Sequence, residues 1–292
     1  MIVLLRALWK TMRPRQWTKN VFVFAALVFD QKLTQLPLLF NTLAAFLFFC
    51  LISSAVYIVN DVADRERDRA HPVKRLRPLA SGQLSPSVAS STAIGMAAIA
   101  LAGAFAVKSA LGWVMLAYLL LNLAYSFYLK NIVIVDVMSI AAGFVLRVLA
   151  GVVVVQVARF SPWLYVCTTL LALFVGLGKR RHEIILLAEN ANSHRAILDH
   201  YTVPFLDQLI SLVTSTTVIA YSLYTFSAPN LPPNHLMMLT IPFVLYGLFR
   251  YLYLIHVRGL GGAPDELLLQ DVPLLLSVVL WAVSVVAILY LD

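Results

Sequence analysis

Long apolar runs constrain the fold of this sequence more than any other feature. Of its 292 residues, 61% are hydrophobic and only 12% are charged, which excludes an ordinary soluble domain. The runs approach the ~20 residues that a helix needs to cross a bilayer, and they are apolar on all sides rather than alternating, so we expect helices rather than barrel strands. The nine predicted spans lie near residues 20–36, 38–60, 86–107, 112–129, 132–157, 162–178, 205–227, 237–256 and 272–291.

The basic residues orient these spans, because Lys and Arg gather in cytoplasmic loops. With the N-terminus inside, the outer segments hold only Lys32, Lys108 and Arg159 of the 22 Lys and Arg residues. We therefore predict an all-α, multi-pass protein of the cell (inner) membrane whose C-terminus lies outside. Residues 1–292 are expected to form one domain. The net charge of +8 is explained by this topology, and no nucleic-acid partner is expected.

An acidic cluster follows the second span directly, in the segment Asn60-Asp61-Val62-Ala63-Asp64-Arg65-Glu66-Arg67-Asp68. If the helix continues, the three aspartates share one face. One interpretation is a salt-bridged helix end, in which Asp61 pairs with Arg65 and Asp64 with Arg67. The other is a site for Mg²⁺, which takes one or two carboxylates and completes its coordination with phosphate oxygens. The spacing alone leaves both open.

The motifs NDVADRERD and RPLASG, in this order between the second and third spans, resemble the first aspartate-rich motif and the Arg-Pro loop of the UbiA superfamily of intramembrane transferases. The resemblance implies nine helices around a central cavity that opens to the cytoplasm. It also implies that Asn60, Asp61, Asp64 and Asp68 hold Mg²⁺ and, through it, a diphosphate. Asp61, Asp64 and Asp68 are then the expected catalytic residues.

The chain departs from the aromatic prenyltransferases of that superfamily, which carry a second aspartate-rich motif after the sixth span. The corresponding segment here is Gly178-Lys179-Arg180-Arg181-His182-Glu183. A basic loop suits a substrate with additional phosphate groups. The chain resembles instead the branch of polyprenyl-phosphate phosphoribosyltransferases, through this segment, Arg13 to Asn20, Tyr125-Ser126 with Lys130, and Asp136 with Gly143 and Arg147.

This resemblance implies transfer of 5-phosphoribose from 5-phosphoribosyl 1-diphosphate to a membrane polyprenyl phosphate of the decaprenyl type, with release of diphosphate. A homo-oligomer is compatible with it. The cations could also follow from membrane orientation alone, with lysines that snorkel at span ends. The candidate substrate-binding residues are Lys19, Asn20, Asn60, Arg77, Tyr125, Lys130, Asp136, Lys179, Arg180, Arg181 and Glu183.

Two ionisable residues lie inside the predicted span 132–157, which makes them functional candidates by default. Asp136, Ser139, Gly143 and Arg147 are spaced to form one stripe facing the cavity, or to form an ion pair within the bundle. Two other functions remain open at this point. One is an aromatic or quinone-precursor prenyltransferase that uses a polyprenyl diphosphate donor, and the other is a non-catalytic membrane carrier.

Overall fold

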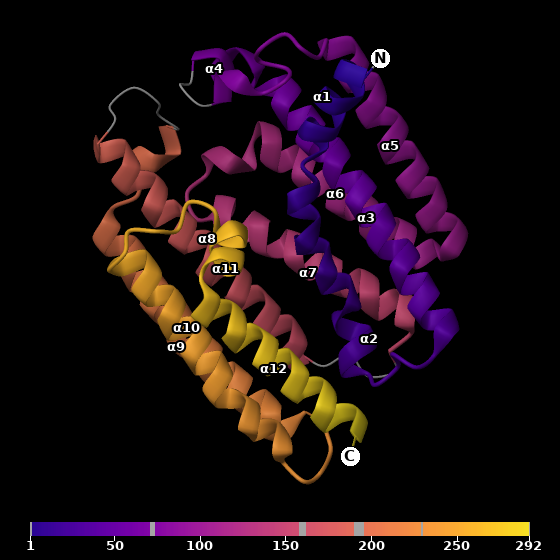
Figure 1. Cartoon of the computed structure of the whole chain (residues 1–292), viewed down its shortest axis with the longest axis vertical. Coiled ribbons are helices and arrows are strands. Elements are labelled where there is room, and N and C mark those ends of the chain that lie inside the picture. Colours follow the sequence, from indigo (N-terminus) through magenta and orange to yellow (C-terminus); the bar gives the residue numbers. More distant parts are fainter. Residues whose placement is uncertain (1, 71–73, 158–161, 190–195, 229, 292) are drawn as a thin grey trace. The chain divides into compact units, whose positions relative to one another are not determined.

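The computed structural model describes residues 2–70, 74–157, 162–189, 196–228 and 230–291, and within these ranges it contains helices and turns but no strand (Figure 1). The chain divides into two compact units. Unit 1 comprises Met1–Leu27, Leu33–Lys130 and Leu146–Gln156, and unit 2 comprises Val28–Lys32, Asn131–Val145 and Val157–Asp292. Whether residues 1–292 act as one domain stays a prediction.

Unit 1 is built from five whole α-helices, the first part of α2, three 3₁₀ helices and the second half of α7. Its elements are α1 (Ile2–Met12), η1 (Pro14–Phe24), the first part of α2 (Ala25–Phe29), α3 (Leu36–Ala63), α4 (Arg65–Ala70), η2 (Lys74–Leu76), α5 (Pro86–Val107), α6 (Ser109–Phe127), η3 (Leu129–Asn131) and α7 (Val135–Val155).

Unit 2 holds the first half of α7 and the remaining helices. These are α8 (Pro162–Glu189), η4 (Ala196–His200), α9 (Val203–Ser227), η5 (Leu236–Thr240), α10 (Ile241–His256), α11 (Pro264–Gln270) and α12 (Val272–Leu291).

Eight helices of the described chain are long and apolar enough to cross a membrane, so this is an integral membrane protein. They match eight of the nine predicted spans. The first predicted span, near 20–36, is not confirmed as a single helix, because η1 and the short α2 occupy it. The polar residues Asp30, Gln31 and Lys32 follow α2, and Gln31 adopts the left-handed φ of 54° that ends a helix.

Small side chains let the helices of unit 1 approach closely. Helix α5 starts at Pro86 behind Ser85, whose hydroxyl accepts a hydrogen bond from the Val88 N–H at 3.3 Å and caps the helix. Its alanines at 89, 93, 100 and 104 are buried. A Cβ on Gly103 would overlap the ring of Phe48 on α3. The core of unit 1 continues through Phe49 and Tyr118, whose rings pack edge to face.

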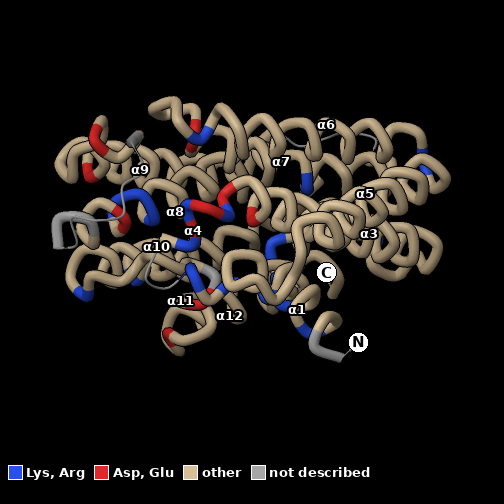
Figure 2. The backbone as a smooth tube through the Cα atoms, turned by 90° about the horizontal axis from the view of Figure 1, so that it is seen from above, with Lys and Arg blue, Asp and Glu red and all other residues tan. Residues whose placement is uncertain are grey.

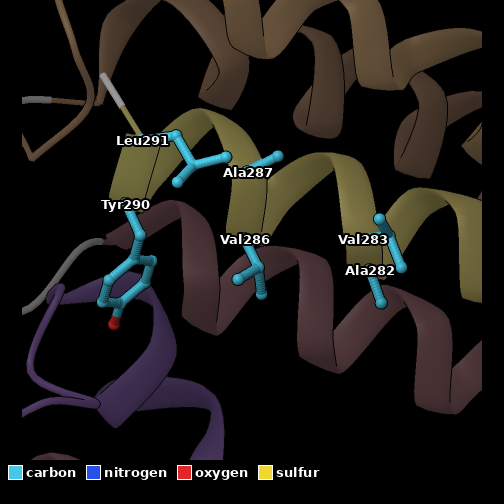
Figure 3. A pocket seen from close by; sticks show the side chains of 6 residues that line it. All are labelled: Ala282, Val283, Val286, Ala287, Tyr290 and Leu291. Carbon is cyan, nitrogen blue, oxygen red and sulfur yellow. The ribbon is translucent and has the colours of Figure 1, made fainter.

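The core of unit 2 lies between α8, α9 and α10 and includes Phe174, Leu206, Ile210 and Tyr251. Six residues of α12, labelled in Figure 3, line an open apolar pocket. Its only polar side-chain atom is the Tyr290 hydroxyl, which donates to the Val28 carbonyl at 3.0 Å. Val283 is 60% exposed. Such a surface is suited to lipid chains rather than to a polar substrate.

Charged residues are unevenly distributed along the chain (Figure 2). In unit 1 they gather around α4, while α3, α5 and α6 are almost free of them. In unit 2 they gather near the C-terminal part of α8. These two groups combine acids with cations, and ionisable residues of a membrane protein are functional candidates.

Candidate active site

The acidic cluster lies where α3 gives way to α4. Asp64 stands between the two helices with φ −92° and ψ 7°, outside helical geometry. Its N–H still donates to the Asn60 carbonyl at 2.9 Å, and its own carbonyl accepts the Asp68 N–H at 2.8 Å. The helix therefore does not continue unbroken through the cluster. The expectation that all three aspartates share one helical face is wrong for this reason.

Asp61 and Asp68 share one arginine. The Arg77 Nη1 atom lies 3.2 Å from Asp61 Oδ1 and 2.6 Å from Asp68 Oδ2. Both carboxylates are buried, with 4% and 5% of their side chains exposed. A buried carboxylate must be paired or hydrogen-bonded, and Arg77 meets that need for both. The predicted partner of Asp61, Arg65, does not occupy this position.

A second arginine, from the segment before η1, reaches the same carboxylate. Arg13 Nη2 lies 2.5 Å from Asp61 Oδ1, and its guanidinium stacks over the ring of Tyr57 at 5.0 Å from the centroid. Arg13 adopts φ 54° and ψ 60°, a left-handed conformation that is uncommon outside glycine and often marks functional sites. Arg13 was absent from the predicted site residues. The only sequence signal for it was its place in the Arg13 to Asn20 motif.

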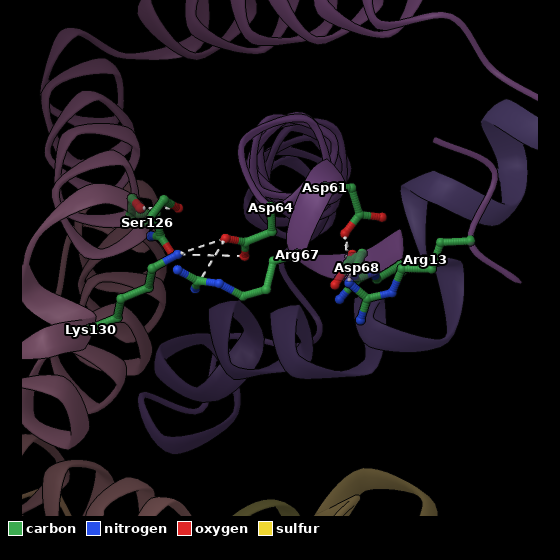
Figure 4. Close-up of polar contacts among 9 residues, drawn as sticks. Arg13, Asp61, Asp64, Arg67, Asp68, Ser126 and Lys130 are labelled. Atoms are coloured by element: carbon green, nitrogen blue, oxygen red, sulfur yellow. Dashed lines mark hydrogen bonds and ion pairs between the residues drawn. The ribbon is translucent and has the colours of Figure 1, made fainter. Parts of the chain in front are cut away.

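Asp64 points away from the other two aspartates and toward a different cation (Figure 4). Lys130, in η3, places its Nζ 3.2 Å and 3.5 Å from the two Asp64 oxygens, and only 9% of this lysine side chain is exposed. Arg67 approaches Asp64 from the solvent side at 3.7 Å. The structure thus brings the predicted residues Arg77 and Lys130 to the acidic cluster. Hereafter the "α3 site" denotes Arg13, Asn60, Asp61, Asp64, Asp68, Arg77 and Lys130.

Asn20 lies away from these carboxylates, in a buried polar network of unit 1. Its Oδ1 accepts a hydrogen bond from Arg147 Nε at 2.8 Å, and its Nδ2 donates to Ser53 Oγ at 3.3 Å. Arg147 also donates to the Tyr118 hydroxyl at 2.7 Å and stacks on that ring. These contacts join η1, α3, α6 and α7. The substrate-binding role of Asn20 stays a prediction.

Two further predicted residues of unit 1, Lys19 and Tyr125, are half-buried. Lys19 donates to the side-chain oxygen of Gln16 within η1. Tyr125 belongs to the last turn of α6, ahead of Lys130. Their roles in substrate binding stay predictions.

A second ionic network surrounds Asp136 in unit 2. Asp136 is completely buried and accepts hydrogen bonds from Arg180 Nε at 2.6 Å and from the Tyr201 hydroxyl at 2.7 Å. Arg180 also pairs with Glu183. Burial, together with the hydrogen bond to the Asp136 carboxylate, raises the pKa of Tyr201 to about 12. The tyrosine therefore remains a proton donor at neutral pH.

The basic segment 179–183 belongs to a helix, contrary to the prediction of a loop. Helix α8 runs on to Glu189, and Arg180 and Glu183 form a pair at i and i+3 within it. Successive residues of the run therefore point in different directions. Lys179 is exposed, whereas Arg181 donates to Asp207 at 2.6 Å and to the Ile255 carbonyl at 3.1 Å. The run does not form one cationic patch.

The α3 site offers oxygen donors of the type that Mg²⁺ prefers. Asn60 Oδ1 is buried without a hydrogen-bond partner, which suits a ligand for a hard cation. However, the part of the chain that the structure describes contains no group of three His, Cys, Asp or Glu placed to hold a metal together. The carboxylates are separated, because Asp64 pairs with Lys130 whereas Asp61 and Asp68 pair with Arg77. The oxygen donors are of the type that binds Mg²⁺. In this structure the carboxylates form ion pairs with Arg13, Arg77 and Lys130 instead.

Comparison with known proteins identifies the family. A model of the UbiA prenyltransferase family matches residues 20–267, which is most of the chain and includes most of the α3 site. The chain belongs to the UbiA prenyltransferase family. Among UbiA-family structures, one described as a UbiA homologue from Archaeoglobus fulgidus bound to GPP and Mg²⁺ matches with a TM-score of 0.75 over 97% of this chain and 99% of that one. At 18% identity, it supports the fold alone.

Curated relatives are closer in sequence. A decaprenyl-phosphate phosphoribosyltransferase of Mycobacterium tuberculosis is 34% identical over 280 residues, covering 94% of this chain and 92% of that protein. A protein of the same name from Corynebacterium glutamicum is 32% identical, covering 97% of this chain and 86% of that protein. This UbiA-family chain is thus similar to transferases over nearly its whole length.

Proposed function

We propose that this protein transfers 5-phosphoribose from 5-phosphoribosyl 1-diphosphate to a membrane polyprenyl phosphate of the decaprenyl type. The observation that carries the proposal is the 34% identity, over 94% of the chain, with a decaprenyl-phosphate phosphoribosyltransferase. The α3 site supports it chemically, because Arg13, Arg77 and Lys130 converge on one short stretch of chain. Guanidinium and ammonium groups are the side chains that bind phosphate oxygens.

The reaction replaces one bond at the ribose C1. A phosphate oxygen of the acceptor lipid forms a bond to C1 as the bond from C1 to the diphosphate oxygen breaks, and the diphosphate leaves with the electron pair. The attacking oxygen is already anionic, so no general base has to remove a proton. Catalysis then rests on positioning and on electrostatic stabilisation of the leaving group.

In this proposal the cations of the α3 site provide that stabilisation. Arg13 and Arg77 keep 30% and 31% of their side chains exposed, so each can donate to a phosphate as well as to its aspartate. Lys130 is more buried and holds Asp64 in place. Asn60, Asp61, Asp64 and Asp68 would hold Mg²⁺, which would supply Lewis-acid stabilisation of the departing diphosphate. The substrate-binding roles of Asp136, Lys179, Arg180, Arg181 and Glu183 stay predictions.

We place the reaction at the cytoplasmic side of the cell membrane. The basic residues favour an N-terminus inside and a C-terminus outside. The charged α3 site then faces the compartment that supplies a soluble phosphorylated sugar donor. The isoprenoid acceptor reaches it from the bilayer.

A two-tube assay tests the proposed reaction on membranes that contain the protein. One tube receives labelled 5-phosphoribosyl diphosphate with polyprenyl phosphate and Mg²⁺, and the other receives a prenyl diphosphate with 4-hydroxybenzoate. We expect a labelled lipid in the first tube only. Product in the second tube alone would make the protein an aromatic prenyltransferase, and no product in either tube would favour a carrier.

Paired variants test the site. Asp61→Asn with Asp64→Asn should abolish turnover while the protein stays folded in the membrane. Glu66→Gln is the matched control, because Glu66 lies in the same segment, pairs with Arg69 at 2.9 Å and leaves 75% of its side chain exposed. If the double variant and the control turn over substrate at equal rates, the α3 site does not take part in the reaction.

A further inference from the structure

Helix α1 is too short to cross a bilayer and presents three distinct faces. It comprises 11 residues, Ile2–Met12, about half the length of a span. Its inner face rests on α3: Ala7 is buried in one apolar cluster with Ala55 and Ile58, and Leu8 and Met12 pack against that cluster. The Met12 carbonyl accepts a hydrogen bond from Ser54 Oγ at 3.1 Å. Helix α1 is therefore held firmly against α3.

The outer side of α1 separates apolar from cationic residues. Leu5 and Trp9 are 58% and 56% exposed and lie one turn apart. Arg6 and Lys10 are also exposed and lie one turn apart. The two pairs are offset by one residue, about 100° around the helix. Going around α1, the protein-facing side is thus followed by an apolar strip and then by a cationic strip.

Charge and aromatic content agree with this arrangement. The first 29 residues contain five cations, namely Arg6, Lys10, Arg13, Arg15 and Lys19, and no acid. Trp9 packs edge to face on Trp17, with ring centroids 5.7 Å apart. Tryptophan is enriched at the boundary between lipid and water, and basic residues close to the membrane surface, such as Arg6 and Lys10 of α1, attract anionic lipids.

We propose that α1 lies in the membrane interface and binds anionic phospholipid head groups. Leu5 and Trp9 enter the acyl region, while Arg6 and Lys10 contact the lipid phosphates. Because α1 leads directly into Arg13, its depth also sets the height of Arg13 and Asp61 relative to the head-group layer. This placement goes beyond the proposed reaction and does not depend on it, since it can be measured on protein that turns over nothing.

The experiment measures depth with an environment-sensitive fluorophore on the full-length protein. Leu5→Cys and the matched control Lys10→Cys are labelled in a background in which Cys50 and Cys167 are replaced by alanine. Each is reconstituted in phosphatidylcholine vesicles with or without phosphatidylglycerol. We expect the label at position 5 to be quenched several-fold more strongly by acyl-chain nitroxides than the label at position 10. Aqueous iodide should show the reverse order.

The anionic lipid supplies the second readout. Quenching of the label at position 5 by acyl-chain nitroxides should increase when phosphatidylglycerol is present. The double variant Arg6→Glu with Lys10→Glu should remove that increase. Equal iodide quenching at both positions would overturn the proposal. Protection of both labels from iodide and from nitroxide would also overturn it, because that result indicates a protein partner on α1. Transfer activity is assayed separately, so a failed reaction and a misplaced helix are distinguishable.

Discussion

At the scale of single residues, the α3 site is a set of carboxylates held apart by cations. Three aspartates within eight residues of sequence would repel one another if left unpaired. Arg77 draws Asp61 and Asp68 together, and Lys130 draws Asp64 to another side. The cations therefore fix where each carboxylate lies in the structure.

Lys130 is the residue whose removal should be most informative. Lys130→Met leaves Asp64 without its buried partner, and we expect the rate of phosphoribosyl transfer to fall about 100-fold. Arg67→Met is the matched control, since Arg67 meets the same aspartate at 3.7 Å with 67% of its side chain exposed. An exposed pair contributes only ~0–1 kcal/mol. Equal losses in the two variants, measured in the same membrane assay, would contradict a special role for Lys130.

Tyr201 provides a prediction about pH. Its pKa is raised from 10.0 to about 12, so the protonated form, which donates to Asp136, is favoured by folding. Its contribution to the free energy of unfolding is therefore complete below pH ~10 and is lost as the pH rises through ~12. The free energies of wild type and Tyr201→Phe, measured in detergent, should differ below pH ~10 and converge above it. A difference that grows with rising pH would contradict this assignment.

At the scale of elements, the segment η1 connects the buried network to the α3 site. Asn20 ties η1 to Arg147 of α7, Trp17 Nε1 donates to Ser54 Oγ on α3 at 3.0 Å, and Arg13 stands immediately before η1. A polar network within the membrane-embedded part of unit 1 satisfies groups that would be costly in lipid. The position of Arg13 thus depends on the contacts that Trp17 and Asn20 make further along η1.

A single glycine allows η1 to approach α7. A Cβ at Gly151 would overlap the Val23 carbonyl oxygen, so Gly151→Ala should destabilise the protein by roughly 1–3 kcal/mol and lower transfer activity through Arg13. Gly95→Ala is the control, because a Cβ there meets nothing within 4 Å. Thermal unfolding in detergent compares the two variants. A Gly151→Ala protein as stable as Gly95→Ala would show that η1 can shift freely.

At the scale of the whole molecule, the number of membrane crossings decides where the termini lie. Nine crossings place them on opposite sides, whereas eight place them on the same side. The described chain contains eight helices of spanning length, and the stretch near 20–36 is made of η1 and α2. The basic residues favour the odd number, because only then do nearly all of them lie on one side.

Reporter fusions separate these two topologies. We expect a C-terminal fluorescent protein that matures only in the cytoplasm to stay dark, and a C-terminal alkaline phosphatase to be active. The same reporters at the N-terminus serve as the control and should give the opposite result. Fluorescence at both ends would mean that η1 and α2 do not cross the membrane.

The sequence by itself determined that this is a helical membrane protein, where most of its spans lie and which family it resembles. These properties depend on the length of apolar runs and on short motifs, which are local. The sequence also identified Arg77 and Lys130 as candidate substrate-binding residues. Only the tertiary structure decided which cation meets which carboxylate. Helical spacing compares residues three or four apart, whereas Asp61 pairs with Arg13 across 48 residues and Asp64 with Lys130 across 66. Which residues pair over such distances depends on how the helices pack. In this protein the packing separates Asp64 from Asp61 and Asp68 and brings Arg13 to Asp61.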